Sequence, residues 1–154
     1  MTEITPGTVG DWKLEVAAYT DGAEPTTWTV VKGLTEFTPP AVEKNLEDDS
    51  SFDSDGWGSQ FATGLSWTAE GTVKRARASL TADPGQEILR AAGNAIAEDG
   101  LVHVRITDRT KPTAGRTGIA DATFTDNGGP RTDLTTAAFS LAGRGGLTGV
   151  TITP

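Results

Sequence analysis

The sequence contains no cysteine and a single histidine. The lack of cysteine excludes a disulfide framework, thiolate metal sites and a cysteine nucleophile. His103 cannot form a two-histidine site, and its place in a Val-His-Val-Arg-Ile alternation predicts a structural role on the polar face of a strand. Neither a G-x-S-x-G elbow nor a phosphate-binding GxxxxGKS/T loop is present. These absences argue against an enzyme, and no cofactor is expected.

Long apolar runs and a net positive charge are also missing. No stretch approaches the roughly 18 apolar residues of a transmembrane helix, and the N-terminal residues lack the basic and apolar regions of a signal peptide. We therefore expect synthesis in a cytoplasm and no membrane partner. The net charge is −8, whereas proteins that bind nucleic acid tightly usually carry a basic surface.

The acidic excess is unevenly distributed along the chain. Residues 1–60 carry 12 acidic and 3 basic side chains, whereas residues 61–154 carry 9 acidic and 10 basic ones. Such a division can create two electrostatic poles that favour head-to-tail self-association. A chance distribution within an acidic protein is the alternative, and composition does not decide between them.

The remaining composition favours strands. A chain of 154 residues is one domain in size, and its 25 threonines suit a pleated sheet because their branched side chains restrict χ1. Alternating or β-rich segments predict strands at 12–19, 27–32, 64–75, 101–108, 118–125, 134–141 and 147–152. Asn127-Gly128-Gly129-Pro130 predicts a hairpin, and Pro39-Pro40 is expected to stop any strand.

One helix is expected. Asp83 is a suitable N-cap, Pro84 fits the first helical position, and Gly100 is a plausible stop. The predicted buried stripe consists of Ile88, Leu89, Ala92, Ala95 and Ile96. The sequence thus predicts a single, mainly β domain over residues 1–154, a β-sandwich or flattened barrel of about seven strands with one flanking α-helix.

Residues 41–62 show neither helical nor strand periodicity clearly and are expected to form a long acidic loop. Loops of this length are usually functional or disordered, and a solvated linker has no need of large apolar side chains. The loop is therefore expected to dock, either on its own domain or on a neighbouring copy. The candidate contact residues are Leu46, Asp48, Asp49, Phe52, Asp53, Asp55, Trp57 and Phe61.

The same segment matches a calcium-binding loop only in part. In an EF-hand alignment, Asp53, Asp55 and Gly56 occupy positions 3, 5 and 6, but Ala62 stands at position 12, where a bidentate Glu is required. The segment also lacks flanking helices. No metal site is expected.

Three segments together carry a family resemblance. They are Trp28 to Leu34 leading into Phe37-Thr38-Pro39-Pro40, then Asp53 to Trp57 followed by Gly64 to Lys74, and finally Ala120 to Leu141 with Gly143 to Ile152. On these segments, spanning about residues 25–153, the chain resembles the major tail tube proteins of long-tailed, siphovirus-type bacteriophages, particularly those of actinobacteria.

The resemblance implies a structural protein of the virion, made in the cytoplasm of the bacterial host. It implies homohexameric rings that stack into a hollow tube, with the long loop and extended termini bridging neighbours. DNA would pass through a negatively charged lumen without specific binding, because like charge keeps phosphates from adhering. Tail tip, tape measure and tail terminator proteins are the implied partners.

The basic run Lys74, Arg75 and Arg77 would hold DNA if it faced this lumen. We therefore expect it outside the lumen or at a subunit interface, opposite the acidic loop of a neighbour. Tail terminators and the tubes of contractile machines share the implied fold. The alternative function is a monomeric carbohydrate- or receptor-binding module that uses exposed Trp57 and Trp67, although Trp67 lies on an apolar strand face and is expected to be buried.

Overall fold

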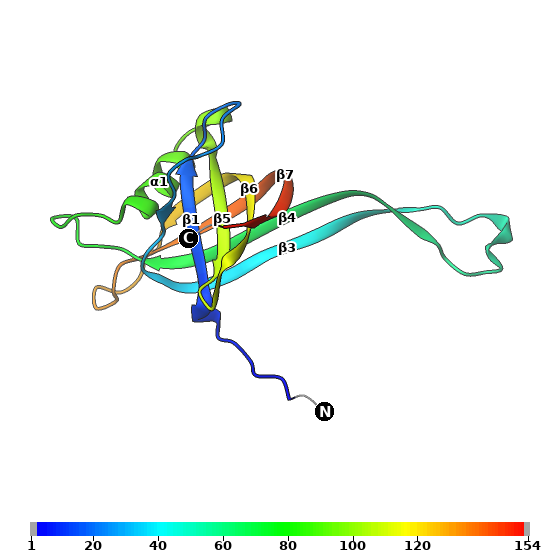
Figure 1. Cartoon of the computed structure of the whole chain (residues 1–154), viewed down its shortest axis with the longest axis horizontal. Helices are drawn as coiled ribbons and strands as arrows, with labels where there is room; N and C mark the ends of the chain where they lie inside the picture. Colours follow the sequence, from blue (N-terminus) through cyan, green and yellow to red (C-terminus); the bar gives the residue numbers. More distant parts are fainter. Residues whose placement is uncertain (1–2, 153–154) are drawn as a thin grey trace.

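The computed structural model describes residues 3–152, which form one antiparallel sheet of seven strands and one α-helix (Figure 1). The strands are β1 (Trp12–Ala18), β2 (Thr29–Val30), β3 (Leu34–Asp48), β4 (Gln60–Lys74), β5 (Leu101–Asp108), β6 (Lys111–Asp126) and β7 (Thr136–Thr151). Their order in the sheet is β2-β1-β5-β6-β7-β4-β3. The prediction of a mainly β fold with about seven strands and one helix is confirmed.

The sheet curls so that its two ends share one core. Leu14 and Val16 of β1 pair in register with Ile106 and Val104 of β5, and all four side chains are buried. Phe37 of β3 and Val31, which follows β2, belong to the same buried cluster although they lie near opposite ends of the strand order. One side of the curled sheet therefore faces the buried core, and the other side faces outward.

The helix α1 (Pro84–Gly93) packs on this body through Leu89 and Ala92. The Asp83 side chain accepts a hydrogen bond from the Gln86 backbone N–H at 3.2 Å, and this confirms the predicted helix start. A Cβ at Gly85 would lie 2.5 Å from the Val30 carbonyl oxygen, so only glycine permits this close approach of α1 to β2.

The predicted helix end was wrong. The helix stops at Gly93 and is capped by Asn94, and Ala97–Gly100 form a separate 3-10 turn, η3. Gly and Asn are weak helix formers, and the left-handed φ of 54° at Ala97 prevents the α-helix from continuing through this residue. Ile96, expected on the buried stripe, is therefore exposed. No helix in residues 3–152 is long and apolar enough to cross a membrane.

The expectation that Pro39-Pro40 would stop a strand was also wrong. The edge strand β3 runs from Leu34 to Asp48 through both prolines, with a register shift against β4 between Thr38 and Ala41. A bulge on an edge strand is one of the few places in a sheet where proline is tolerated, because its missing N–H is not needed there.

At the other end of the chain, β6 and β7 are longer than predicted. The predicted hairpin between them is confirmed, although its connection runs over residues 127–135 and its turn lies at Pro130–Asp133 rather than at 127–130. The segments 134–141 and 147–152 merge into the single strand β7. An irregularity in the pairing between Thr117 and Ile119, opposite a Gly145 with a φ of 87°, lets the strand continue past the glycines. The strand count agrees with prediction because β3 was missed while two predicted strands merged.

Candidate functional site: the hairpin arm and the notch

The segment 41–62, expected to be a loop, is instead most of a β-hairpin. Strand pairs extend outward from Val42↔Trp67 to Asp48↔Gln60, and only residues 49–59 form the turn. Figure 1 shows this hairpin projecting well beyond the body. We call residues 41–67 the arm and residues 49–59 its tip. The sequence did not predict these strands, because a two-stranded ribbon exposed on both faces does not need alternating polar and apolar residues.

One face of the arm carries apolar side chains that the body does not cover. Antiparallel partners project to the same side, so Val42, Leu46 and Leu65 lie on the face that carries Trp67 in the body. Trp67 is only 3% exposed, whereas Leu65, two positions along, is 71% exposed. Phe61 lies on the opposite face beside Glu47 and is also exposed. The apolar surface thus continues outward past the point where the body ends.

The tip is an ordered turn. A short 3-10 segment, η2 (Phe52–Ser54), is followed by Asp55 and Gly56 in left-handed conformations, and the Trp57 N–H donates to the Ser54 carbonyl at 2.9 Å. The Phe52 side chain is fully exposed and Trp57 is 80% exposed. The tip therefore presents two aromatic rings to solvent from a defined backbone.

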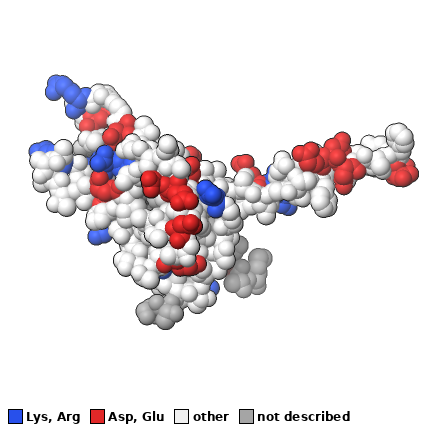
Figure 2. Space-filling view, turned by 90° about the horizontal axis from the view of Figure 1, so that it is seen from above, with Lys and Arg blue, Asp and Glu red and all other residues white. Residues whose placement is uncertain are grey.

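Carboxylates surround these rings. Hydrogen bonds from the Ser50 side chain and backbone hold the pKa of Asp48 below its usual range, and the backbone N–H bond measures 2.8 Å. Figure 2 shows acidic side chains gathered along the outer part of the projection. All eight predicted contact residues lie on the arm, and all are exposed: Leu46, Asp48, Asp49, Phe52, Asp53, Asp55, Trp57 and Phe61. Within residues 3–152, no group of three or more His, Cys, Asp or Glu side chains is arranged to hold a metal ion.

The basic run divides into two kinds of residue. The Arg75 guanidinium donates to Gln86 Oε1 at 3.0 Å and Glu87 Oε1 at 3.2 Å, and it lies 5.3 Å from the centre of the Phe124 ring. Burial would raise the pKa of Glu87, but hydrogen bonds from Arg90 and Arg75 outweigh it and leave that pKa lowered. Arg75 therefore braces β4 against α1 and β6.

This arrangement corrects the expectation for Arg75, whose side chain is engaged within its own chain. Lys74 and Arg77 are exposed and remain available to a partner. The backbone carbonyl of Lys74 is held in the body by Gln86 Nε2, which donates to it at 2.9 Å.

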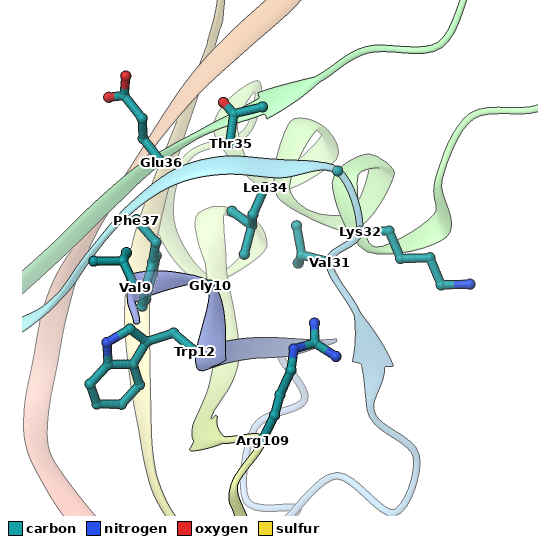
Figure 3. A pocket seen from close by; sticks show the side chains of 11 residues that line it. Val9, Gly10, Trp12, Val31, Lys32, Leu34, Thr35, Glu36, Phe37 and Arg109 are labelled. Carbon is teal, nitrogen blue, oxygen red and sulfur yellow. The ribbon is translucent and has the colours of Figure 1, made fainter. Parts of the chain in front are cut away.

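A notch opens where β3 approaches the start of β1. Its volume is about 300 Å³, and its apolar lining comes from Val9, Trp12, Val31, Leu34 and Phe37 (Figure 3). Lys32, Glu36 and Arg109 add charged groups to its wall. Sequence reasoning missed the notch because it depends on the curl that brings both ends of the sheet together, and no local pattern encodes that approach.

The outer side of the sheet has two contrasting halves. Over β1 and β5, Arg105 donates to both carboxylate oxygens of Glu15, at 2.7 and 3.3 Å, and lies under the Trp28 ring. His103 stacks on Tyr19 at 5.4 Å between ring centres. Burial lowers the pKa of His103, and its Nε2 has no hydrogen-bond partner among residues 3–152.

The second half, over β3, β4, β7 and β6, carries short polar side chains. The strand register places on one face Glu36, Thr38, Thr68, Glu70, Thr72, Asp121, Thr123 and Ser140. We call this the hydroxyl-carboxylate face. Its nearest cations lie at its margins, since Lys74 ends β4 and Arg144 lies beyond Ala142 along β7.

Trp67 does not form an exposed aromatic platform. Its ring is buried against Gly143, where an added Cβ would overlap the indole, and its Nε1 donates to the Gly145 carbonyl at 3.1 Å. The expectation that this residue is buried is confirmed. Of the two tryptophans considered for a binding module, only Trp57 is exposed.

Comparison with solved structures shows what the whole chain is similar to. The SPP1 tail tube protein matches with a TM-score of 0.70 and 13% identity, covering 97% of this chain and 81% of that one. A protein of the tail of an empty gene transfer agent particle matches with a TM-score of 0.69 and 13% identity, covering 93% and 98%.

A protein of the anti-feeding prophage baseplate gives a TM-score of 0.66 at 7% identity, over 96% of this chain and 97% of that one. No protein-family model and no curated protein sequence matches the chain. Similarity at such low identity speaks for the fold. The chain has the fold of phage tail tube proteins, as its sequence resemblance implied.

Proposed function

We propose that the chain is the structural subunit of a bacteriophage tail tube, in which homohexameric rings stack around a continuous bore that conducts DNA. The observation that carries the proposal is the arm, a hairpin of defined structure whose apolar side chains have no cover from the body. A protein with the tail tube fold and such a projection is suited to self-assembly. We propose no catalytic role.

Ring formation is supported by the edges of the sheet. The sheet ends at β3 on one side and at the two-residue strand β2 on the other. Edge strands have backbone groups that can pair with another chain. A head-to-tail contact that closes by rotation gives a ring, and the similar gene transfer agent tail has C6 symmetry.

The hydroxyl-carboxylate face is our candidate for the lumen wall. Glu36, Glu70 and Asp121 would repel the phosphates of DNA. Threonine and serine side chains offer no flat ring on which a base could stack. The outer half over β1 and β5, where Trp28 and Arg105 lie, is less suited to a passage for a polyanion.

The arm is our candidate for contacts between subunits and between rings. Its acidic side chains complement the exposed Lys74 and Arg77, which lie at the opposite end of β4. In the virion, the rings at the two ends of the tube would meet tail tip and tail terminator proteins, and a tape measure protein would occupy the bore during assembly.

Electron microscopy of the purified protein tests the proposal. Negatively stained samples across a range of concentrations should contain rings or tubes with a central hole. A variant with a shortened arm serves as the control and should remain dispersed. Single particles at every concentration would contradict the tube and favour the carbohydrate- or receptor-binding alternative, which glycan binding through Trp57 would then test.

A further inference from the structure

We propose that the notch of one copy receives the arm tip of a second copy. The inference rests on the proposed self-assembly and specifies which two surfaces meet. In this contact, Phe52 and Trp57 of the tip pack against the apolar wall of the notch, while the tip aspartates face Lys32 and Arg109.

The tip has the properties of an anchor. Phe52 and Trp57 are large, exposed aromatic side chains held on a turn with internal hydrogen bonds. Exposed aromatic groups of this kind are costly to leave in water, and buried aromatic anchors supply much of the binding energy at interfaces. Because the turn is already ordered, docking would cost little further conformational entropy.

The notch has the properties of a receptor. Trp12 and Leu34, with the accessible edge of the largely buried Phe37, supply apolar surface among polar groups, and the volume of about 300 Å³ can hold an aromatic side chain. The arm points away from the body of its own chain, as Figure 1 shows, so its tip does not reach its own notch. An arm tip that fills the notch therefore has to come from another copy.

Charge distinguishes the notch from a second hollow of the body, the groove beside α1. Lys32 and Arg109 are exposed, and neither forms an ion pair with any residue between 3 and 152. The groove beside α1 is larger, at about 490 Å³, but its border includes Glu87, Glu98 and Asp99. The charged groups of that groove are all carboxylates and would repel an acidic tip. The notch has one carboxylate, Glu36, and two exposed cations, so its balance of charge attracts the tip.

Mixed single-cysteine variants test the contact directly, because the chain has no cysteine of its own. Chains carrying Thr35→Cys at the notch are mixed with chains carrying Asp53→Cys at the tip and then mildly oxidised. A covalent dimer is expected. The control replaces the notch partner with Ala91→Cys, an exposed position in the groove beside α1, and should give no such dimer.

A covalent dimer between Asp53→Cys and Ala91→Cys would overturn the proposal. The absence of a dimer between Asp53→Cys and Thr35→Cys would also overturn it. Tube formation is scored separately by microscopy of the wild-type protein. Wild-type tubes without the Thr35→Cys product contradict this docking but leave the tube intact. Absence of wild-type tubes contradicts the proposed function, and the dimer then still reports whether tip and notch meet.

A charge exchange gives a second test that does not use cysteine. Arg109→Asp should raise the concentration needed for assembly about tenfold, an effect in the range of interfacial ion pairs. Adding Asp53→Arg should restore most of the loss. Asp53→Arg should not rescue Arg131→Asp, a reversal at an exposed arginine outside the notch. Equal rescue of both variants would show that only net charge matters and would contradict the docking.

Discussion

The inner and outer parts of β4 have the same backbone conformation but opposite surroundings. Trp67 is enclosed by the body, and Leu65, on the same face two residues earlier, is in solvent. Hydrogen bonds to β3 continue through both regions. A two-stranded ribbon by itself is marginally stable in water. The enclosed part of β4 therefore contributes to the folding of the chain, whereas the exposed apolar side chains of the arm have no packing partner within residues 3–152.

The largest expected effect comes from removing the arm. Replacing residues 44–65 with Asn-Gly joins Glu43 directly to Ser66, which are already cross-strand partners, through a tight hairpin turn. Rings and tubes should disappear from electron micrographs. The midpoint of thermal unfolding should stay close to that of the wild type, since the deleted side chains contribute nothing to the core cluster. A large fall in that midpoint would contradict the separation of the two regions.

Within β4, Trp67→Ala should lower the free energy of unfolding by about 3–5 kcal/mol, because it empties a packed site and removes a hydrogen bond. The matched variant Leu65→Ala should change it by about 0.5 kcal/mol or less. Denaturant unfolding of the two proteins measures both values. If both variants lost a similar free energy of unfolding, Leu65 would contribute to the folded body as Trp67 does, and this would contradict the division of β4.

In the basic run, charge reversal can separate a residue that stabilises the folded body from one that is available to a partner. Arg75→Glu should destabilise the monomer by about 1–3 kcal/mol, since it removes hydrogen bonds to Gln86 and Glu87 and places like charges together. Arg77→Glu should leave unfolding within about 0.5 kcal/mol of the wild type, yet raise the concentration needed for assembly. Normal assembly by Arg77→Glu would remove this residue from the interface.

The proposed lumen wall predicts a smaller, salt-dependent effect. Tubes of Glu70→Lys should retain short DNA at low ionic strength and release it as salt is added, whereas wild-type tubes should retain none. Co-sedimentation of labelled DNA with tubes measures the difference. Glu98→Lys, at an exposed position of η3 outside this face, is the control for a general change of charge. Equal retention by the two variants would place Glu70 outside the bore.

The smallest effect concerns His103. Burial lowers the pKa of its imidazole in the folded protein, so the unfolded chain takes up the proton first as pH falls. The stability contributed by the neutral ring is therefore complete above pH 6.5 and declines as the pH drops below that value. His103→Gln should flatten the dependence of melting temperature on pH in this range. An unchanged slope would assign the dependence to other groups.

The sequence predicted best where packing and local preference agree. The strand at 101–108 was located because its alternation matches two sides of a sheet, and the helix start because Asp83 and Pro84 each favour it. The aromatic residues of the acidic segment were predicted as contact candidates because they lack an internal explanation, and the structure leaves them exposed on the arm. The arm, Arg75 and the notch were missed or misjudged because each depends on chain segments that are distant in sequence.

Pro39 and Pro40 have a final consequence for the edge of the sheet. They interrupt the free edge of β3 at the junction of body and arm, where neither residue has an N–H to offer a further strand. An uninterrupted edge of 15 residues would be a template for unlimited fibre-like growth. Because the two prolines divide the edge of β3, each remaining stretch for pairing with another strand is shorter. This favours a closed assembly over unlimited aggregation.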